Sequence, residues 1–379
     1  MNNTTEYEFT IGLEQQLFLA YYVILIVFTV AGNTLVCGAI YLDVRLRSPT
    51  NWFIASLAVS DLFYGLAGLP FRIASNVTPM TNVAVCSAWI WMDMVCAAAS
   101  MANLAVISVD RYMKITKPFC YHRNMTKKRS LLAICGVWLY AAILATFAII
   151  KWPGAKGVVI DPTHHTCYND NKVFYTVANI VAFLSPLVVV IASYSLIFRT
   201  ALTQFNKMKH LIVNTSTKED RRKQKSVVRD FKATKTLAVV LGTFTVCWAP
   251  FFIMFTISQY DPFYLMPLPY NVGLAFYYLF ILILPNLNSA CNPVIYAYFN
   301  AEFRRSFRKI MWSSCDGQNQ DQGSLKKRRR SSVTSFFQMT FARRNSPQAG
   351  GNDDKNHNNS QEDEKTFLTC NGDTTITQV

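Results

Sequence analysis

Charged residues are scarce in this chain. Asp, Glu, Lys and Arg make up only 16% of its 379 residues, whereas 51% are hydrophobic. A soluble protein carries roughly 25% charged residues, so the composition argues against soluble globular domains and also against a disordered chain. The apolar residues form uninterrupted runs, such as 17–40 and 131–150. Runs of about 20 apolar residues cross the hydrocarbon core of a bilayer, and the chain is therefore predicted to be a membrane protein.

Other features are absent as well. The ten cysteines lack the clustered CxxC spacing of a zinc site, no nucleophile stands with a matched base, and no internal repeat suggests a transporter. The net charge of +15 comes from basic residues between and after the apolar runs, so nucleic acid is not an expected partner. The first residues are polar and acidic, unlike a cleaved signal peptide. We therefore predict neither an enzyme nor a metalloprotein, and we expect the first apolar run to direct membrane insertion.

Seven apolar runs can be counted, at 17–42, 51–74, 84–112, 130–151, 173–199, 233–258 and 270–298. Backbone groups in lipid must form their hydrogen bonds within one segment, which favours helices. The predicted fold is an all-α membrane protein with a seven-transmembrane helix bundle at 17–298. Residues 1–16 are expected to be an extracellular N-terminus, 299–315 an amphipathic membrane-surface helix and 316–379 a disordered cytoplasmic tail.

Lys and Arg gather in alternate loops, and this bias predicts the orientation of the chain. The basic loops contain Arg45 and Arg47, then Lys114, Lys117, Arg123, Lys127, Lys128 and Arg129, then Lys207, Lys209, Lys218, Arg221, Arg222, Lys223 and Lys225. We therefore expect a multi-pass plasma-membrane protein whose N-terminus is extracellular. Glycosylation is expected at the sequons of Asn2 and Asn3, whereas Asn124 and Asn214 should be cytoplasmic and unmodified.

Polar residues inside the runs are costly in a bilayer and point to function. Four ionisable residues stand out, namely Asp61, Asp93, Asp110 and Arg111. A polar cluster around Asp61 can be assembled from Asn33, Ser100, Asn288, Ser289 and Asn292. Converging carboxylate and amide oxygens suit a hard cation such as sodium. Hydrogen bonding between helices explains such a cluster equally well, so the residues leave both interpretations open.

Short motifs recur in order along the seven runs. They are Gly32-Asn33 with Val36, Leu57-Ala58-Val59-Ser60-Asp61, Asp110-Arg111-Tyr112, Trp138, Pro186 with Tyr194, Cys247-Trp248-Ala249-Pro250 and Asn292-Pro293-Val294-Ile295-Tyr296. Through these residues the chain resembles class A (rhodopsin-like) G protein-coupled receptors over about residues 17–312. The resemblance implies a receptor that signals to a heterotrimeric G protein, with arrestin and receptor kinases as further partners.

The resemblance also implies roles for individual residues. Arg111 would pair with Asp110 and with Asp230 and hold the cytoplasmic helix ends together until activation. Tyr112, Tyr194 and Tyr296 would belong to the same switch. Cys86 and Cys167 would form an extracellular disulfide. Trp248, with Phe244 one turn away, would transmit ligand binding to the core, although an aromatic residue in a helix is usually just bundle core.

Asp93 is the residue from which we predict the ligand. It follows Cys86 by seven residues, which places it ~10 Å down a helix from the outer end. We expect no basic partner for it in the neighbouring spans, so that a protonated amine would supply the missing charge. The position resembles the amine-anchoring aspartate of aminergic receptors, and Phe251 and Phe252 resemble their aromatic floor. A protonated, neutral Asp93 is the alternative.

Several positions depart from the aminergic pattern. Ala178, Asn179 and Ala182 stand where catecholamine receptors carry serines, which disfavours a catechol ligand. Asn286 stands where a tyrosine usually bonds to the anchoring aspartate. A peptide or orphan receptor is therefore the main alternative to a small cationic amine, and a transporter or channel is a more distant one.

The cytoplasmic segments predict further partners. Phe119 resembles the residue with which the family contacts the G protein. Cys315 follows an amphipathic stretch and is a candidate for palmitoylation at membrane lipids. The run 326–330, followed by Ser331 and Ser332, resembles a basophilic kinase site. The C-terminal residues 377–379 fit a PDZ ligand. No cofactor is expected, and a sodium ion is a candidate allosteric ligand at the Asp61 cluster.

Overall fold

The computed structural model describes residues 13–163, 165–211, 218–261 and 268–316. Seven of its helical stretches are long and apolar enough to cross a membrane. They are Gln15–Leu42, Pro49–Ser75, Val83–Thr116, Lys127–Ile149, Lys172–Thr200, Ala238–Tyr260 and Tyr270–Phe299. Each coincides with one expected apolar run, and no boundary differs by more than five residues. The prediction of a seven-helix membrane bundle is confirmed.

The described chain contains twelve α-helices, a short strand pair and four other helical segments. The α-helices are α1 Leu13–Leu42, α2 Pro49–Phe63, α3 Leu69–Val77, α4 Val83–Thr116, α5 Pro118–Asn124, α6 Lys127–Ile149, α7 Lys172–Asn179, α8 Ser185–Leu211, α9 Lys218–Tyr260, α10 Tyr270–Phe276, α11 Leu284–Phe299 and α12 Ala301–Asp316. The strands are β1 Val158–Ile160 and β2 Cys167–Asn169, and η1 Val44–Leu46 is a 3₁₀ turn. The segments η2 Tyr64–Gly68, η3 Ile180–Leu184 and η4 Tyr277–Ile283 are π-helical.

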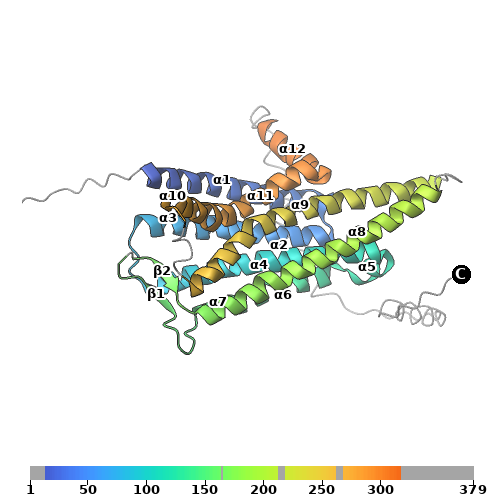
Figure 1. Cartoon of the computed structure of the whole chain (residues 1–379). Coiled ribbons are helices and arrows are strands. Elements are labelled where there is room, and N and C mark those ends of the chain that lie inside the picture. Colours follow the sequence, from blue (N-terminus) through green and yellow to red (C-terminus); the bar gives the residue numbers. More distant parts are fainter. Residues whose placement is uncertain (1–12, 164, 212–217, 262–267, 317–379) are drawn as a thin grey trace, which may run out of the picture. The chain divides into compact units, whose positions relative to one another are not determined.

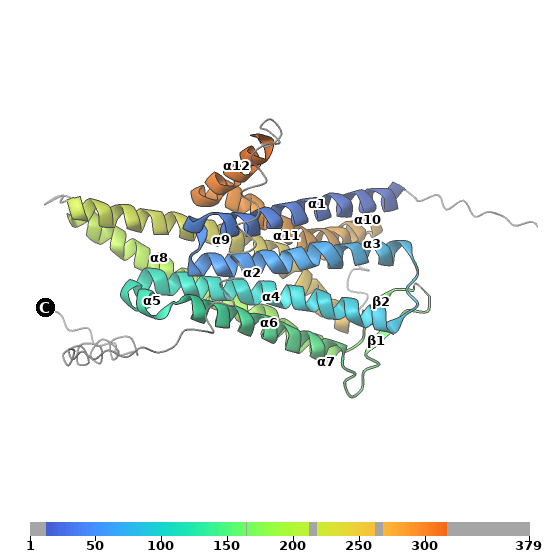
Figure 2. The ribbon, with the colours of Figure 1, turned by 180° about the vertical axis from the view of Figure 1, so that it is seen from behind.

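Helix α4 is the central helix of the bundle. It packs against α2, α6 and α8, while α11 packs against α1 and α9 (Figures 1 and 2). The largest buried cluster is apolar and is drawn from α1, α2, α4, α8, α9, α11 and α12. Many side chains on the outward faces, such as Leu132 and Val188, are both apolar and exposed, as expected of helices that face lipid.

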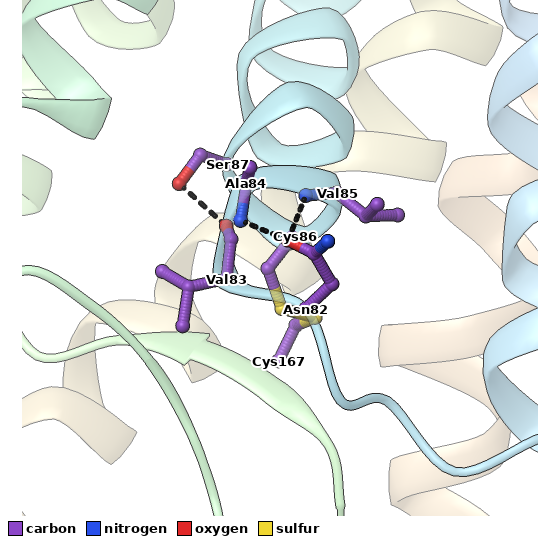
Figure 3. Close-up of a disulfide and its surroundings, with 7 residues drawn as sticks. All are labelled: Asn82, Val83, Ala84, Val85, Cys86, Ser87 and Cys167. Carbon is purple, nitrogen blue, oxygen red and sulfur yellow. Dashed lines mark hydrogen bonds between the residues drawn. A yellow bond between two sulfur atoms is a disulfide. The ribbon is translucent and has the colours of Figure 1, made fainter.

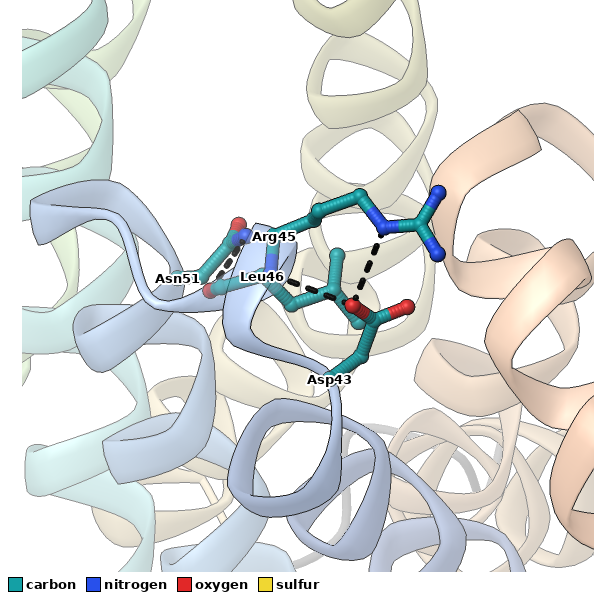
Figure 4. Close-up of polar contacts among 4 residues, drawn as sticks. All are labelled: Asp43, Arg45, Leu46 and Asn51. Atoms are coloured by element: carbon teal, nitrogen blue, oxygen red, sulfur yellow. Dashed lines mark hydrogen bonds and ion pairs between the residues drawn. The ribbon is translucent and has the colours of Figure 1, made fainter.

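Local sequence signals set the starts of the helices. Ser48 accepts a hydrogen bond from the backbone N–H of Asn51, and Pro49 occupies the first turn of α2, where a missing N–H costs nothing. The preceding turn is closed by Asp43, which accepts from the Arg45 backbone at 3.1 Å and pairs with its Nε at 3.4 Å (Figure 4). The Asn51 side-chain amide donates to the Leu46 carbonyl at 2.8 Å. Side-chain hydrogen bonds thus stabilise the turn that connects α1 and α2.

The loop between α6 and α7 folds back onto the start of α4. Its strands β1 and β2 pair antiparallel, with Val158 opposite Asn169. Cys86 of α4 and Cys167 of β2 form the disulfide that the family resemblance implies (Figure 3). Asn82 caps the same end of α4 by accepting from the Ala84 backbone at 2.8 Å. The loop is thereby held close to the turns of α4 that precede Asp93.

Three of the spans are not continuous α-helices, which the sequence analysis did not anticipate. The π-helical segments η2, η3 and η4 interrupt the second, fifth and seventh spans. Such segments often occur at functional sites. Each contacts or adjoins a predicted ligand-binding residue, since Tyr64 of η2 and Leu282 of η4 are hydrogen-bonded to Asn286 and η3 directly follows Asn179.

Helix α12 follows the bundle, with Phe303 and Phe307 buried and Arg304 and Arg305 exposed, and its placement at the membrane surface stays a prediction. Of two compact units, the first ends at Ile310 and the second begins at Met311. Several predictions lie outside the described residues and stay predictions: the sequons of Asn2 and Asn3, the kinase site, the C-terminal PDZ ligand and the tail. The side chains of Phe119, Asp230 and Cys315 are likewise outside the described part.

Candidate functional site

The carboxylate of Asp93 has a basic partner, contrary to our expectation. Arg72 of α3 approaches it with Nη2 at 3.6 Å from Oδ2. The expectation was wrong because the second span supplies Arg72, whose long side chain reaches the carboxylate. The side chains of Arg72 and Asp93 keep 22% and 33% of their area exposed. The ion pair is therefore accessible to a ligand rather than sealed in the core.

Aromatic side chains hold Arg72 in place. Its guanidinium lies over the Trp89 ring at 5.4 Å from the ring centroid, within the range of a cation–π contact. Trp89 in turn stacks on Phe71 at 5.1 Å. The hydroxyls of Tyr22 and Tyr64 also interact with Arg72. Three spans meet at this ion pair, since Tyr22 belongs to the first, Tyr64 and Arg72 to the second, and Trp89 and Asp93 to the third.

Asn286 joins the same network through Tyr64. The Tyr64 hydroxyl donates to Oδ1 of Asn286, and the Asn286 amide donates to the carbonyl of Leu282. Asn286 is only 2% exposed. The described contacts therefore place Asn286 behind Tyr64, and a polar connection runs from α11 through Tyr64 and Arg72 to Asp93.

The predicted aromatic floor is assembled as a stack on α9. Trp248 stacks with Phe252 at 5.4 Å and meets Phe251 edge-on at 5.5 Å. Phe252 also stacks on Phe183 of η3 at 4.2 Å, and Phe244 lies below Trp248 at 6.0 Å. A small cavity lined by Asp93 and Trp248 shows that the acidic group and this stack are neighbours.

The fifth span offers few free polar groups. The Asn179 amide nitrogen donates to Oγ1 of Thr256 at 2.5 Å and to the carbonyl of Phe252 at 3.3 Å. Ala178 is buried in an apolar cluster with Ala148 and Phe174, and Ala182 is 8% exposed. Asn179 thus ties the fifth span to α9 in this structure.

The polar cluster around Asp61 is assembled much as the sequence predicted. Asp61 is 1% exposed and accepts from the Asn292 amide at 2.8 Å. Ser100 pairs with Ser60 at 2.9 Å between their hydroxyl oxygens. Asp61, Ser100 and Asn288 line one cavity of about 20 Å³ that Asp93 also lines. This volume suits a water molecule or a small ion and is far below that of a ligand pocket.

Comparisons with known proteins agree with this architecture. Residues 32–296 match the family described as "7 transmembrane receptor (rhodopsin family)". The chain belongs to this family. The recognition of a rhodopsin-like receptor is thus confirmed, and a receptor family agrees with the prediction that the chain is not an enzyme.

Dopamine receptors are among the curated relatives of this chain. The D(5)-like dopamine receptor of Takifugu rubripes is 33% identical over 312 residues, and the D(1A) dopamine receptor of Xenopus laevis is 31% identical over 327. The D(1) dopamine receptor of Carassius auratus is 32% identical over 323 residues. Each match covers 76% of this chain, and they cover 65%, 70% and 86% of the relatives, respectively. The chain thus spans slightly less than two thirds of the first of them.

In this receptor, the residues near the C-terminal end of α4 are paired differently from our expectation. Asp110 accepts from the Thr50 hydroxyl at 2.5 Å and from the Tyr121 hydroxyl at 2.9 Å. Among the described residues, no ion pair joins Arg111 to Asp110. The expected pairing is therefore corrected for this structure, because two hydroxyl donors on α2 and α5 already satisfy the carboxylate. The expected contact with Asp230 lies outside the described side chains.

Two further residues predicted for the switch, Tyr194 and Tyr296, lie near Arg111. Nε of Arg111 and the hydroxyls of Tyr194 and Tyr296 are buried without a hydrogen-bond partner among the described residues. They come from α4, α8 and α11, respectively. Buried polar groups in such a state are usually bridged by water. Tyr112 is partly buried in α4.

Sequence reasoning missed Arg72, Tyr64 and Tyr121. Arg72 follows Asp61 by eleven residues, which is about three helical turns, so a search for polar residues on the face of Asp61 would have found it. Tyr64 lies one turn after Asp61 on that face. Tyr121 had no such signal, because its partner Asp110 belongs to another helix.

Proposed function

We propose that this receptor is a plasma-membrane protein activated by a small extracellular amine that binds at Asp93. The observation that carries the proposal is a partly exposed carboxylate beside an aromatic stack, in a chain whose curated relatives bear the name dopamine receptor. An ammonium group gains a charge-assisted hydrogen bond from such a carboxylate and a favourable contact with aromatic faces. Trp248, Phe251 and Phe252 would contact the remainder of the ligand.

A catecholamine is not the ligand that we favour. A catechol needs hydrogen-bonding groups on the fifth span, where Ala178 and Ala182 offer none. The Asn179 amide nitrogen is engaged with Thr256 and Phe252, which leaves its Oδ1 as a single acceptor for a catechol hydroxyl. Asn286 is in turn engaged with Tyr64, and we assign it to positioning that tyrosine.

Binding would be transmitted to the cytoplasmic side as a shift between two helix arrangements. Pro250 and Pro293 lie inside α9 and α11 and remove backbone hydrogen bonds at which these helices can bend. Arg111, Tyr194 and Tyr296 would rearrange at the other end, together with Asp110, Tyr112 and Asp230. A heterotrimeric G protein would bind the open arrangement, followed by receptor kinases and arrestin.

Sodium is the proposed allosteric ligand, held by Asp61, Ser100 and Asn288. These three side chains carry oxygen atoms and line one small cavity, which fits a hard cation. The amide nitrogen of Asn292 faces Asp61, so Asn292 would hold the carboxylate rather than bind the ion. Palmitoylation of Cys315, contact of α12 with membrane lipids and a PDZ partner at the C-terminus complete the proposed set of interactions.

Two matched variants test the amine site. We expect Asp93→Ala to abolish both binding of and response to an amine identified by screening, while surface expression persists. Arg111→Ala is the control, which should bind the same amine with unchanged affinity and fail to stimulate nucleotide exchange. Radioligand binding and nucleotide exchange on the same membranes separate the two effects. An Asp93→Ala receptor with unchanged amine potency would remove the aminergic assignment and leave a peptide or orphan receptor. An ionic current without nucleotide exchange would indicate a channel.

A further inference from the structure

The ion pair between Arg72 and Asp93 restricts the class of amine that fits. A ligand ammonium must approach the same carboxylate that Arg72 already approaches at 3.6 Å. Two cations would then share one anion. Because like charges repel strongly where water is partly excluded, a plain amine either tolerates a neighbouring guanidinium or drives it away from its partner.

Arg72 cannot easily leave. Its guanidinium lies over Trp89, which stacks on Phe71, and the hydroxyls of Tyr22 and Tyr64 interact with the same side chain. These neighbours are neutral, so they orient the guanidinium without cancelling its charge. A displaced Asp93 would therefore leave Arg72 without its negative partner in this pair, which is an expensive state for a partly buried cation.

A second charge on the ligand removes this cost. If the ligand also carries a carboxylate, its ammonium can bind Asp93 while its carboxylate binds Arg72. The two charges of the receptor then exchange one internal ion pair for two external ones, and the net charge of the site stays at zero. The planar guanidinium is well suited to a carboxylate, which it can bind with two parallel hydrogen bonds.

We propose that the ligand of this receptor is a zwitterion, an α-amino acid with an aromatic side chain. This inference rests on the proposed amine site at Asp93 and adds Arg72 as the residue that binds the acidic group. An α-amino acid carries its ammonium and carboxylate on one carbon, so that the two charges lie side by side as those of Arg72 and Asp93 do. The stack of Trp248, Phe251 and Phe252 would receive the aromatic ring.

The test compares amino acids with the amines formed from them by loss of the carboxylate. The probes are tyrosine and tyramine, tryptophan and tryptamine, phenylalanine and phenethylamine, and histidine and histamine, applied in amino-acid-free buffer to cells that express the full chain. Cyclic AMP and calcium are recorded together with surface expression. In at least one pair we expect the amino acid to be at least about tenfold more potent than the amine, since a lost charged contact commonly costs that much. The methyl ester of that amino acid, which keeps the ammonium and the ring, should lose the advantage on the unmodified receptor.

Variants then assign the effect to Arg72. Arg72→Gln should weaken the amino acid by about tenfold or more and leave the amine equal or stronger, while Arg72→Lys should keep the preference for the amino acid. The double variant Arg72→Asp with Asp93→Arg restores an ion pair and controls for folding. If the amines activate the receptor and their parent amino acids and methyl esters are no more potent than they are, the proposal of a zwitterionic ligand is overturned. The proposed amine site would still stand. If neither the amines nor the amino acids activate a receptor that reaches the cell surface, both the proposed amine site and this inference are overturned.

Discussion

The ionisable residues of the spans fall into two groups according to how their charge is compensated. Asp61 and Asp110 are each 1% exposed and are satisfied by neutral donors, Asn292 for the first and Thr50 with Tyr121 for the second. Asp93 is partly exposed and is paired with a cation. A carboxylate held by several internal donors is costly to disturb, whereas an accessible ion pair can exchange partners. This difference supports Asp93 as the binding residue and the other two as structural or switch residues.

A single methyl group should reveal how closely α1 and α11 pack. A Cβ added at Gly32 would lie 2.8 Å from Cγ and 2.9 Å from Cβ of Pro293. Because a proline ring cannot rotate away, we expect Gly32→Ala to lower the free energy of unfolding by about 1–3 kcal/mol, the usual cost of overpacking. Thermal unfolding of the purified receptor can be followed with a thiol-reactive dye, since Cys96 and Cys247 are buried free cysteines.

The control for this prediction lies two turns along the same helix. A Cβ at Gly38 meets no atom within 4 Å, so Gly38→Ala should leave the unfolding midpoint unchanged or raise it slightly. Equal midpoints for the two variants would show that Pro293 does not pack against Gly32 in the way described.

At the scale of elements, the short helix α5 is attached to α4 by one hydrogen bond to a charged group. Tyr121 donates to Asp110 at 2.9 Å. Burial, followed by the negative charge of Asp110, raises the pKa of Tyr121 above its ordinary value, so the phenol stays protonated and remains a donor at physiological pH. The hydrogen bond also keeps one oxygen of Asp110 from pairing with Arg111.

We expect Tyr121→Phe to reduce signalling and, through the same shift between arrangements, to lower the apparent affinity for the amine. Loss of a hydrogen bond to a charged group costs about 1.5–3 kcal/mol, and the released oxygen becomes available to Arg111, which would favour the tethered arrangement. Nucleotide exchange stimulated by the amine should therefore need about tenfold more ligand. Tyr41→Phe is the control, because Tyr41 is 69% exposed. Unchanged coupling in Tyr121→Phe would show that the hydrogen bond has no part in the switch.

For the whole molecule, apolar length was sufficient to predict the bundle. Each run of about 20 apolar residues became a span, because in lipid a segment of this kind has few alternatives to a helix. The cluster around Asp61 was also predictable, since its members are polar residues inside four of the apolar runs. In contrast, the π-helical segments had no recognisable signal, because they change the hydrogen bonding of a helix without changing its composition.

The errors at the site share a physical cause. Asp93 was treated as isolated, although Arg72 stands in the neighbouring span, because apolar residues surround Arg72 in the sequence. The predicted partner of Asp110 was wrong because charge alone suggested Arg111. The fold instead brings the hydroxyls of Thr50 and Tyr121 to this carboxylate. Spacing along one helix is readable from a sequence. Which of several donors reaches an acceptor on another helix depends on how the helices pack.

The orientation of the whole bundle gives the last prediction. The disulfide-bonded hairpin of β1 and β2 lies at one end of the bundle and α5 lies at the other (Figure 1), and the basic residues Lys127, Lys128 and Arg129 begin the helix that follows α5. Since basic loops stay cytoplasmic, we expect an antibody against an N-terminal tag to label intact cells and one against a C-terminal tag to label permeabilised cells alone.

Enzymatic removal of N-linked glycans should lower the apparent mass of the receptor, and the double variant Asn2→Gln with Asn3→Gln should abolish that shift. Asn124→Gln, at a sequon on the predicted cytoplasmic side, should leave it unchanged. Labelling of a C-terminal tag on intact cells would reverse the orientation and place Asp93 out of reach of any extracellular ligand.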